Sequence, residues 1–209
     1  MFGFKTKVKP TVVFEKTPQG IVLYEKKKPV FVDQKEPKTV DEVYYFNNYL
    51  HPFFSLDGDT LTDEFPVDHP YHRGIFWAWH QLYIYNESIG DGWIMDKITQ
   101  DVVDLKTKAD KYSAQLSLNV LWKSSLFQHN QPFIHEHTKI IVHTIKSGIR
   151  IIDFEIDLMA LVPGVSIGGS DDEKGYGGFC ARIKLPENLC FTSESGQVEP
   201  QTLQIKAGS

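Results

Sequence analysis

Apolar and polar residues alternate along most of the chain with a period of two, which is typical of β-strands. The segment Ile75–Tyr85 alternates throughout. Because both of its faces carry large apolar side chains, we expect it to lie in the centre of a sheet. Further strands are predicted at 12–14, 21–24, 30–32, 43–49, 115–122, 137–145 and 149–158. Helical periodicity is nearly absent, so the chain is predicted to be all-β and to form a β-sandwich.

The predicted strand at 149–158 has one face that suits exposure to solvent and one that suits burial. Its acidic residues share one face, and its apolar residues Ile152, Phe154, Ile156 and Leu158 share the other. The acidic residues are Asp153, Glu155 and Asp157. This alternation predicts a sheet with one wet side.

Two segments lack a strand pattern. Residues 104–113 are polar enough to form a helix or the tip of a hairpin, and the sequence does not decide between them. Residues 163–178 hold six glycines and the acidic run 171–173. A long loop of this kind inside a compact sheet protein is either functional or mobile. We expect it to be exposed and mobile near the functional site, as a lid.

Composition narrows the class of protein. With 209 residues and 24.0 kDa the chain suits a single β-sandwich domain over 1–209, and its aromatic fraction of 13% favours sheet. The net charge of -5 and pI of about 5.9 argue against a nucleic-acid partner. No stretch approaches the roughly 20 apolar residues that cross a bilayer, so a soluble protein is predicted. Oligomeric state is not predicted.

The first residues of the chain and its two cysteines give little information about compartment or function. The first five residues lack the layout of a signal peptide. The compartment stays open: periplasmic or secreted if a leader was removed, and cytoplasmic otherwise. Cys180 and Cys190 have no redox or zinc spacing, so two free thiols are expected rather than a disulfide.

The densest group of chemically active side chains is the segment Asp68-His69-Pro70-Tyr71-His72-Arg73-Gly74. It places a carboxylate, two imidazoles and a guanidinium on a turn before the strand at Ile75. Pro70 fixes the direction of the chain, and Gly74 permits a close approach or an unusual dihedral angle. Two His residues three apart can aim at one point, as proton-transfer groups or as metal ligands. The alternative is a polar turn whose side chains bind only backbone.

The crowding of polar groups and the flanking Trp77 and Trp79 favour a functional site. We expect His69, His72 and Arg73 to project into one pocket shared with Arg182. Positive charge close to the imidazoles lowers their pKa, which keeps at least one of them neutral near pH 7.

A second group is His135-Glu136-His137. In a strand the two His residues share one face, and Glu136 falls on the opposite, mainly apolar face. A carboxylate there is costly to bury unless it is paired, and burial makes it a candidate general acid or base. The alternative is an edge strand with a wet polar face. His-x-His also occurs in cupin metal sites, but the Glu expected a few residues later is missing.

The third group is the glycine-rich segment 174–182, which ends in Arg182. It lacks the Gly-Lys-Ser/Thr sequence and the following helix of a phosphate loop. Arg182 is either a fixed cation facing an anionic or hydroxyl-rich ligand or a surface residue.

The region Leu50–Gln81 resembles the PmoA-like family of unknown function. The resemblance rests on the segment Asp68–Gly74, on Trp77-Ala78-Trp79-His80 and on Gly90-Asp91-Gly92-Trp93, and it extends from about Gly20 onward. It implies a bacterial protein that is often met beside carbohydrate-degradation functions, with a longer chain than this one, so the sandwich is expected to be truncated at its C-terminus. The family's label, methane oxygenase, implies a membrane subunit and is set aside. A galactose-mutarotase-like supersandwich is an analogous fold.

The residues and the resemblance leave three possible functions for this protein. The first is a sugar-modifying hydrolase, lyase or epimerase that uses His69, His72 and Glu136 for acid–base chemistry. The second is a carbohydrate-binding domain for a small sugar or oligosaccharide. The third, less favoured, is a His-ligated metal protein; no metal or cofactor is predicted. Residues predicted to contact the ligand are Asp68, Arg73, Trp77, Trp79, His80, Trp93 and Arg182.

Overall fold

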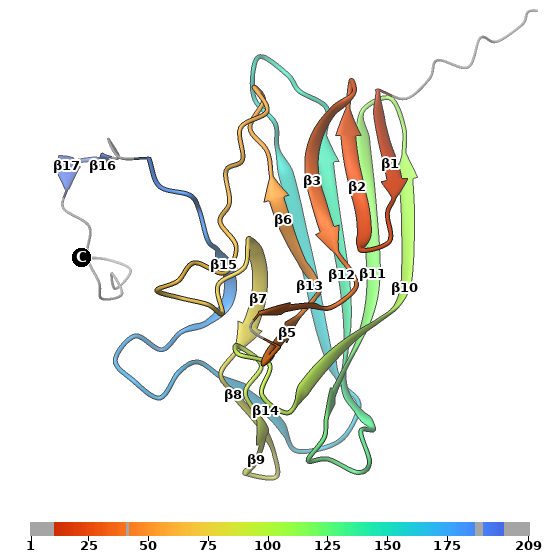
Figure 1. Cartoon of the computed structure of the whole chain (residues 1–209), viewed down its shortest axis with the longest axis vertical. Helices are drawn as coiled ribbons and strands as arrows, with labels where there is room; N and C mark the ends of the chain where they lie inside the picture. Colours follow the sequence, from red (N-terminus) through yellow and green to blue (C-terminus); the bar gives the residue numbers. More distant parts are fainter. Residues whose placement is uncertain (1–10, 41, 187–189, 199–209) are drawn as a thin grey trace, which may run out of the picture.

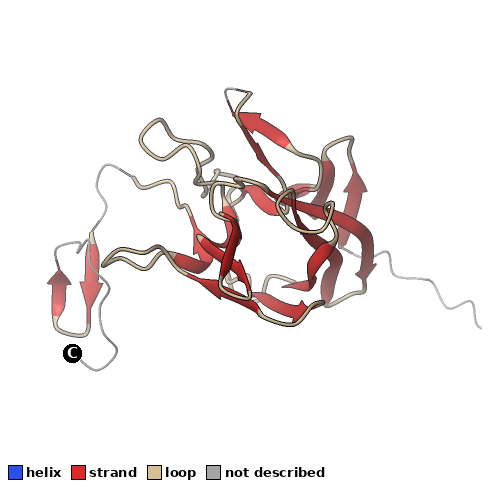
Figure 2. Cartoon of the chain, turned by 90° about the horizontal axis from the view of Figure 1, so that it is seen from below, coloured by secondary structure: helices blue, strands red, loops and turns tan. Residues whose placement is uncertain are grey.

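A computed structural model describes residues 11–40, 42–186 and 190–198 of the chain. In this part of the chain all regular structure is β-strand and no helix occurs (Figure 2). The all-β prediction is confirmed. No helix long and apolar enough to cross a bilayer is found among these residues.

The first large sheet has six antiparallel strands in the spatial order β1-β2-β3-β6-β7-β15. Their bounds are β1 (Val12–Lys16), β2 (Gly20–Glu25), β3 (Lys28–Gln34), β6 (Tyr49–Phe53), β7 (Ile75–Trp79) and β15 (Gly177–Ala181). Strands β1 to β3 are joined by short turns, whereas β15 arrives from far along the chain to pair with β7. This long-range pairing carries Arg182 to the segment that precedes β7.

The second large sheet is a meander of four antiparallel strands in chain order. Its strands are β10 (Ile98–Ala109), β11 (Ser113–Ser124), β12 (Pro132–His143) and β13 (Ile152–Ala160). Residues 104–113 are therefore the end of β10 and a tight turn into β11, which decides for the hairpin. Smaller sheets are formed by β8 (Gln81–Ile84), β9 (Glu87–Gly90) and β14 (Val165–Gly168), by β4 (Lys38–Val40) and β5 (Tyr44–Phe46), and by β16 (Phe191–Ser193) and β17 (Gly196–Val198).

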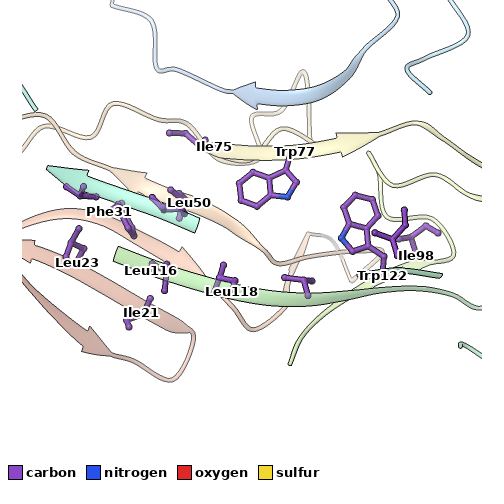
Figure 3. Close-up of a cluster of buried hydrophobic side chains, with 14 of the residues drawn as sticks. Ile21, Leu23, Phe31, Leu50, Ile75, Trp77, Ile98, Leu116, Leu118 and Trp122 are labelled. Carbon is purple, nitrogen blue, oxygen red and sulfur yellow. The ribbon is translucent and has the colours of Figure 1, made fainter. Parts of the chain in front are cut away.

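The two large sheets lie face to face and enclose one main core (Figure 1). Buried apolar residues from both sheets meet there, including Phe31 and Leu50 from one sheet and Leu118 and Trp122 from the other (Figure 3). Along β11 every second residue is buried, as alternation requires in a strand with one face toward the core.

The predicted wet and dry faces of 149–158 are confirmed. On β13, Asp153, Glu155 and Asp157 are exposed, and the intervening apolar residues are half-buried against the core. The segment 163–178 is largely exposed or half-exposed. It contains strand β14 and a turn in which Asp172 accepts hydrogen bonds from the backbone of Lys174 and Gly175. Its action as a lid stays a prediction.

The expected continuous strand Ile75–Tyr85 is not formed. It divides at His80 into β7, which lies next to the edge of the six-stranded sheet, and β8, which is the central strand of a three-stranded sheet. His80 Nδ1 lies 2.8 Å from Asp91 Oδ2 at this break. Alternation specifies which side chains face inward, but it does not specify which strand each half of the segment pairs with.

Candidate functional site

The segment Asp68–Gly74 is a tight turn between two short antiparallel stretches. Phe65 N donates to His72 O at 2.8 Å, and Gly74 N donates to Asp63 O at 2.9 Å. Gly74 has φ +52°, and a Cβ built there would lie 2.0 Å from the carbonyl oxygen of Leu50. Only glycine fits both this dihedral angle and this close approach, so the special backbone expected at Gly74 is confirmed.

Backbone hydrogen bonds bring Arg182 to this turn. Arg182 N donates to Gly74 O at 2.7 Å, and Asp63 N donates to Arg182 O at 2.9 Å. The Arg182 side chain then reaches His72, with its guanidinium 3.5 Å from Nδ1. The His72 ring stacks on the His69 ring at a centroid distance of 4.7 Å. The structure therefore brings these two imidazoles together with Arg182, which is part of the arrangement that the sequence predicts.

Two carboxylates complete a group that we call the His72 cluster, which consists of Asp63, Asp68, His69, His72 and Arg182. Asp68 Oδ2 accepts a hydrogen bond from His69 Nδ1 at 2.8 Å. The guanidinium of Arg182 lies 3.7 Å from Asp68 Oδ1 and 4.0 Å from Asp63 Oδ2. These longer distances leave Arg182 loosely held between the two carboxylates.

Burial, together with the nearby charges of His69 and Arg182, lowers the pKa of His72 to about 4. His72 is therefore neutral at pH 7, as the sequence predicts. Because its Nδ1 accepts from Arg182, its proton lies on Nε2. His69 has the opposite arrangement: its Nδ1 donates to Asp68, which leaves Nε2 as an acceptor when the ring is neutral.

Aromatic rings extend from one side of His72. His72 contacts the Trp93 ring edge-on at 5.7 Å. Trp93 is stacked between His80, at 5.1 Å, and Tyr176, at 5.9 Å. Trp93 is only 5% exposed, whereas Tyr176 is 46% exposed. Tyr176 is thus the accessible end of the stack.

Of the three Trp residues predicted to stack on a ligand, none forms an exposed strip. Trp77 is 2% exposed and lies in the core between the large sheets. Trp79 is half-buried and packs on Trp122 at 6.1 Å. Trp93 is buried as well, whereas the neighbouring Tyr176 presents an exposed aromatic ring. The signal for Tyr176 was an aromatic residue set between Gly175 and Gly177.

Arg73 does not join the other predicted groups. It is 1% exposed, and its guanidinium lies between the rings of Phe46 and Phe76 at 4.5 and 4.3 Å. It donates to the carbonyl oxygens of Tyr71 and Trp93, and burial lowers its pKa to about 9. Successive side chains in an extended segment point to opposite sides. Since His72 faces the cluster, Arg73 faces the interior, and the prediction that Arg73 shares a pocket with His69, His72 and Arg182 is wrong.

Glu136 is also separate from the His72 cluster. It lies on β12, which is an inner strand of its sheet and not the edge strand that was one alternative. Its side chain is fully buried and accepts hydrogen bonds from Asn48, Trp122 and Thr138. None of these partners belongs to the cluster. Of the two alternatives for Glu136, the structure has the buried carboxylate on an apolar face, and it does not place Glu136 beside the imidazoles.

No metal centre is apparent in the described residues, where no three His, Cys, Asp or Glu side chains gather in a suitable arrangement. Cys180 and Cys190 are free, as expected. A cavity of about 740 Å³ lies elsewhere, along β10, where Asn47 and Gln100 are among the residues that line it.

Comparison with known sequences gives one result. A model of a family of unknown function (DUF6807) matches residues 11–202. The chain belongs to this family. No curated protein and no solved structure matches it. Membership in DUF6807 therefore assigns no activity, and function has to be inferred from the site itself.

Proposed function

We propose that this DUF6807 protein is carbohydrate-active and that the His72 cluster binds a sugar or sugar derivative and acts on it by acid–base chemistry. The observation that carries the proposal is the convergence of His69 and His72, from one turn, with Arg182, from a distant part of the chain. The resemblance of the segment Asp68–Gly74 to the PmoA-like family, often met beside carbohydrate degradation, points in the same direction.

The groups at the site suit a ligand with many hydroxyl groups. The carboxylates of Asp63 and Asp68 accept hydrogen bonds from hydroxyls, and Arg182 donates them. Tyr176 offers an exposed ring on which the apolar face of a sugar can stack. With two carboxylates around one guanidinium, the cluster favours a neutral ligand over an anion.

The two imidazoles have complementary roles. His69, oriented by Asp68 through Nδ1, accepts a proton from the ligand at Nε2. His72, held neutral, donates a hydrogen bond from Nε2–H to the ligand oxygen on which negative charge develops. Arg182 orients the ligand and supplies positive charge. Glu136, which is buried elsewhere, takes no part in this chemistry.

The second candidate is a non-catalytic carbohydrate-binding domain, in which the same groups only bind hydroxyls. One observation favours it: the side chains of His69 and Asp68 are 52% and 66% exposed, so the described residues do not screen the site from water. Catalytic sites usually exclude water, because exclusion strengthens electrostatic interactions.

The test is a sugar library screened for binding by calorimetry and for conversion by NMR. The enzyme hypothesis predicts a converted sugar, and a His69→Gln variant that still binds it but turns it over at least about 100-fold more slowly. His137→Gln, at an exposed His on β12, is the matched control and should behave as wild type. Binding without conversion would favour the binding domain. Absence of any sugar binding would refute both candidates.

A further inference from the structure

The interior between the two large sheets contains a group of hydrogen-bonding side chains that the proposed function does not use. We call it the interior polar cluster; it consists of Asp33, Asn48, Trp77, Gln100, Trp122, Glu136 and Thr138. Asp33, on β3, lies on the same face of its strand as Phe31 in the core. Gln100 and Glu136 reach the interior from the opposite sheet. Figure 3 shows Trp77 and Trp122 pointing into the same space from the two sheets.

Both carboxylate oxygens of Glu136 have hydrogen-bond partners within this cluster. Trp122 Nε1 donates to it at 2.8 Å, Thr138 Oγ1 at 2.7 Å, and Asn48 Nδ2 at 3.1 and 3.2 Å. Asn48 Nδ2 also lies 3.4 Å from Gln100 Oε1. These contacts fix the orientation of both amides, because Asn48 must present its NH₂ group to the carboxylate and Gln100 must present its oxygen to Asn48.

With the amides fixed, four buried polar atoms of this cluster have no hydrogen-bond partner. They are Asp33 Oδ2, Asn48 Oδ1, Trp77 Nε1 and Gln100 Nε2. Their residues are each at most 3% exposed. Leaving one such group unpaired costs about 1–3 kcal/mol. Four together would cost about 4–12 kcal/mol, which is comparable with the whole net stability of a domain.

The four atoms are two acceptors and two donors, and this balance identifies the ligand. A metal ion could bind the two oxygens, but it would leave the two N–H groups without an acceptor. A water molecule donates two hydrogen bonds and accepts two. Buried waters with about three such bonds are regular parts of protein interiors.

We propose that the interior polar cluster binds ordered water, which donates hydrogen bonds to Asp33 and Asn48 and accepts hydrogen bonds from Trp77 and Gln100. Water enters from the cavity of about 740 Å³ along β10, since Gln100 and Asn47 line that cavity and Asn47 Nδ2 bonds the backbone oxygen of Gln100 at 2.6 Å. Glu136 is connected through Asn48 to Gln100, which lines this cavity.

The test is NMR on the intact protein with its Trp indole groups labelled with ¹⁵N. The indole proton of Trp77 should show a dipolar cross-peak at the water frequency, with the opposite signs in laboratory-frame and rotating-frame experiments that mark a bound water. Trp122, equally buried but bonded directly to Glu136, is the internal control and should show none. Trp77→Phe assigns the resonance.

A high-resolution crystal structure gives an independent readout. It should show a water within hydrogen-bond distance of Asp33 Oδ2 and at least two of the other three atoms. Absence of the Trp77 cross-peak, together with a dry site in which the four atoms pair directly, would overturn the inference. So would a peak that anomalous scattering from crystals soaked in Mn²⁺ identifies as a metal.

Discussion

The ionisation of Asp33 gives the sharpest prediction about stability. Asp33 is buried in the core, and burial, followed by the charge of Glu136, raises its pKa from 3.8 to about 7. The folded protein therefore keeps a proton on Asp33 at pH values where the unfolded chain has released it. Because the unfolded state binds fewer protons in this range, stability falls as the pH rises from 3.8 to about 7.

The magnitude follows from the shift of roughly 3 units. At about 1.4 kcal/mol per unit, ionised Asp33 costs the folded state about 4 kcal/mol above pH 7. About 1.5 kcal/mol of this is already present at pH 5. Asp33→Asn keeps the shape of the side chain and removes the ionisation. The stability of Asp33→Asn relative to wild type should therefore increase by about 3 kcal/mol between pH 5 and pH 8.

Urea denaturation followed by Trp fluorescence at pH 5, 6, 7 and 8 measures this difference. The control is Asp101→Asn, which removes an exposed carboxylate that lies 2.6 Å from Lys123. Its difference from wild type should be below about 1 kcal/mol at every pH. A difference for Asp33→Asn that does not change with pH would refute the reasoning, because the Asp33 carboxylate would then ionise equally in both states.

Four further outcomes are expected. Arg73→Ala should lower the free energy of unfolding by roughly 3–5 kcal/mol and Arg73→Met by less, because a Met side chain still fills the space between the rings; urea denaturation measures both, and equal losses would contradict this packing role. Gly74→Ala should cost more than about 3 kcal/mol, from left-handed backbone strain and the clash with the Leu50 oxygen, and a melting point like that of wild type would refute it. Tyr176→Ala should weaken sugar binding at least about 10-fold in calorimetry with an unchanged melting point; unchanged affinity would exclude stacking. Because the folded pKa of His72 is lowered to about 4, wild type should lose stability relative to His72→Gln as the pH falls from 6.5 toward 4, measured by thermal melts across that range.

Several features of this protein are determined by sequence alone. Alternation of apolar and polar residues places most of the strands, the acidic outer face of β13 and the buried position of Glu136, because side chains in a strand point alternately to its two faces. The residue types in Asp68–Gly74 also predict that one imidazole is neutral, because positive charges close together disfavour its protonated form, but the burial that contributes most to the lowered pKa of His72 is set by the tertiary structure.

Other features are decided only by tertiary structure. Whether Arg182 reaches His72 depends on β15 pairing with β7, a contact between segments about a hundred residues apart in the chain. Whether Arg73 or His72 faces the site depends on which side of the turn packs on Phe46 and Phe76. The division of Ile75–Tyr85 at His80 depends on strand pairing in two different sheets. Local alternation predicts the face of the strand on which a side chain lies, but it does not predict which strand pairs with it. Register and strand order are set by the packing of the whole sheet.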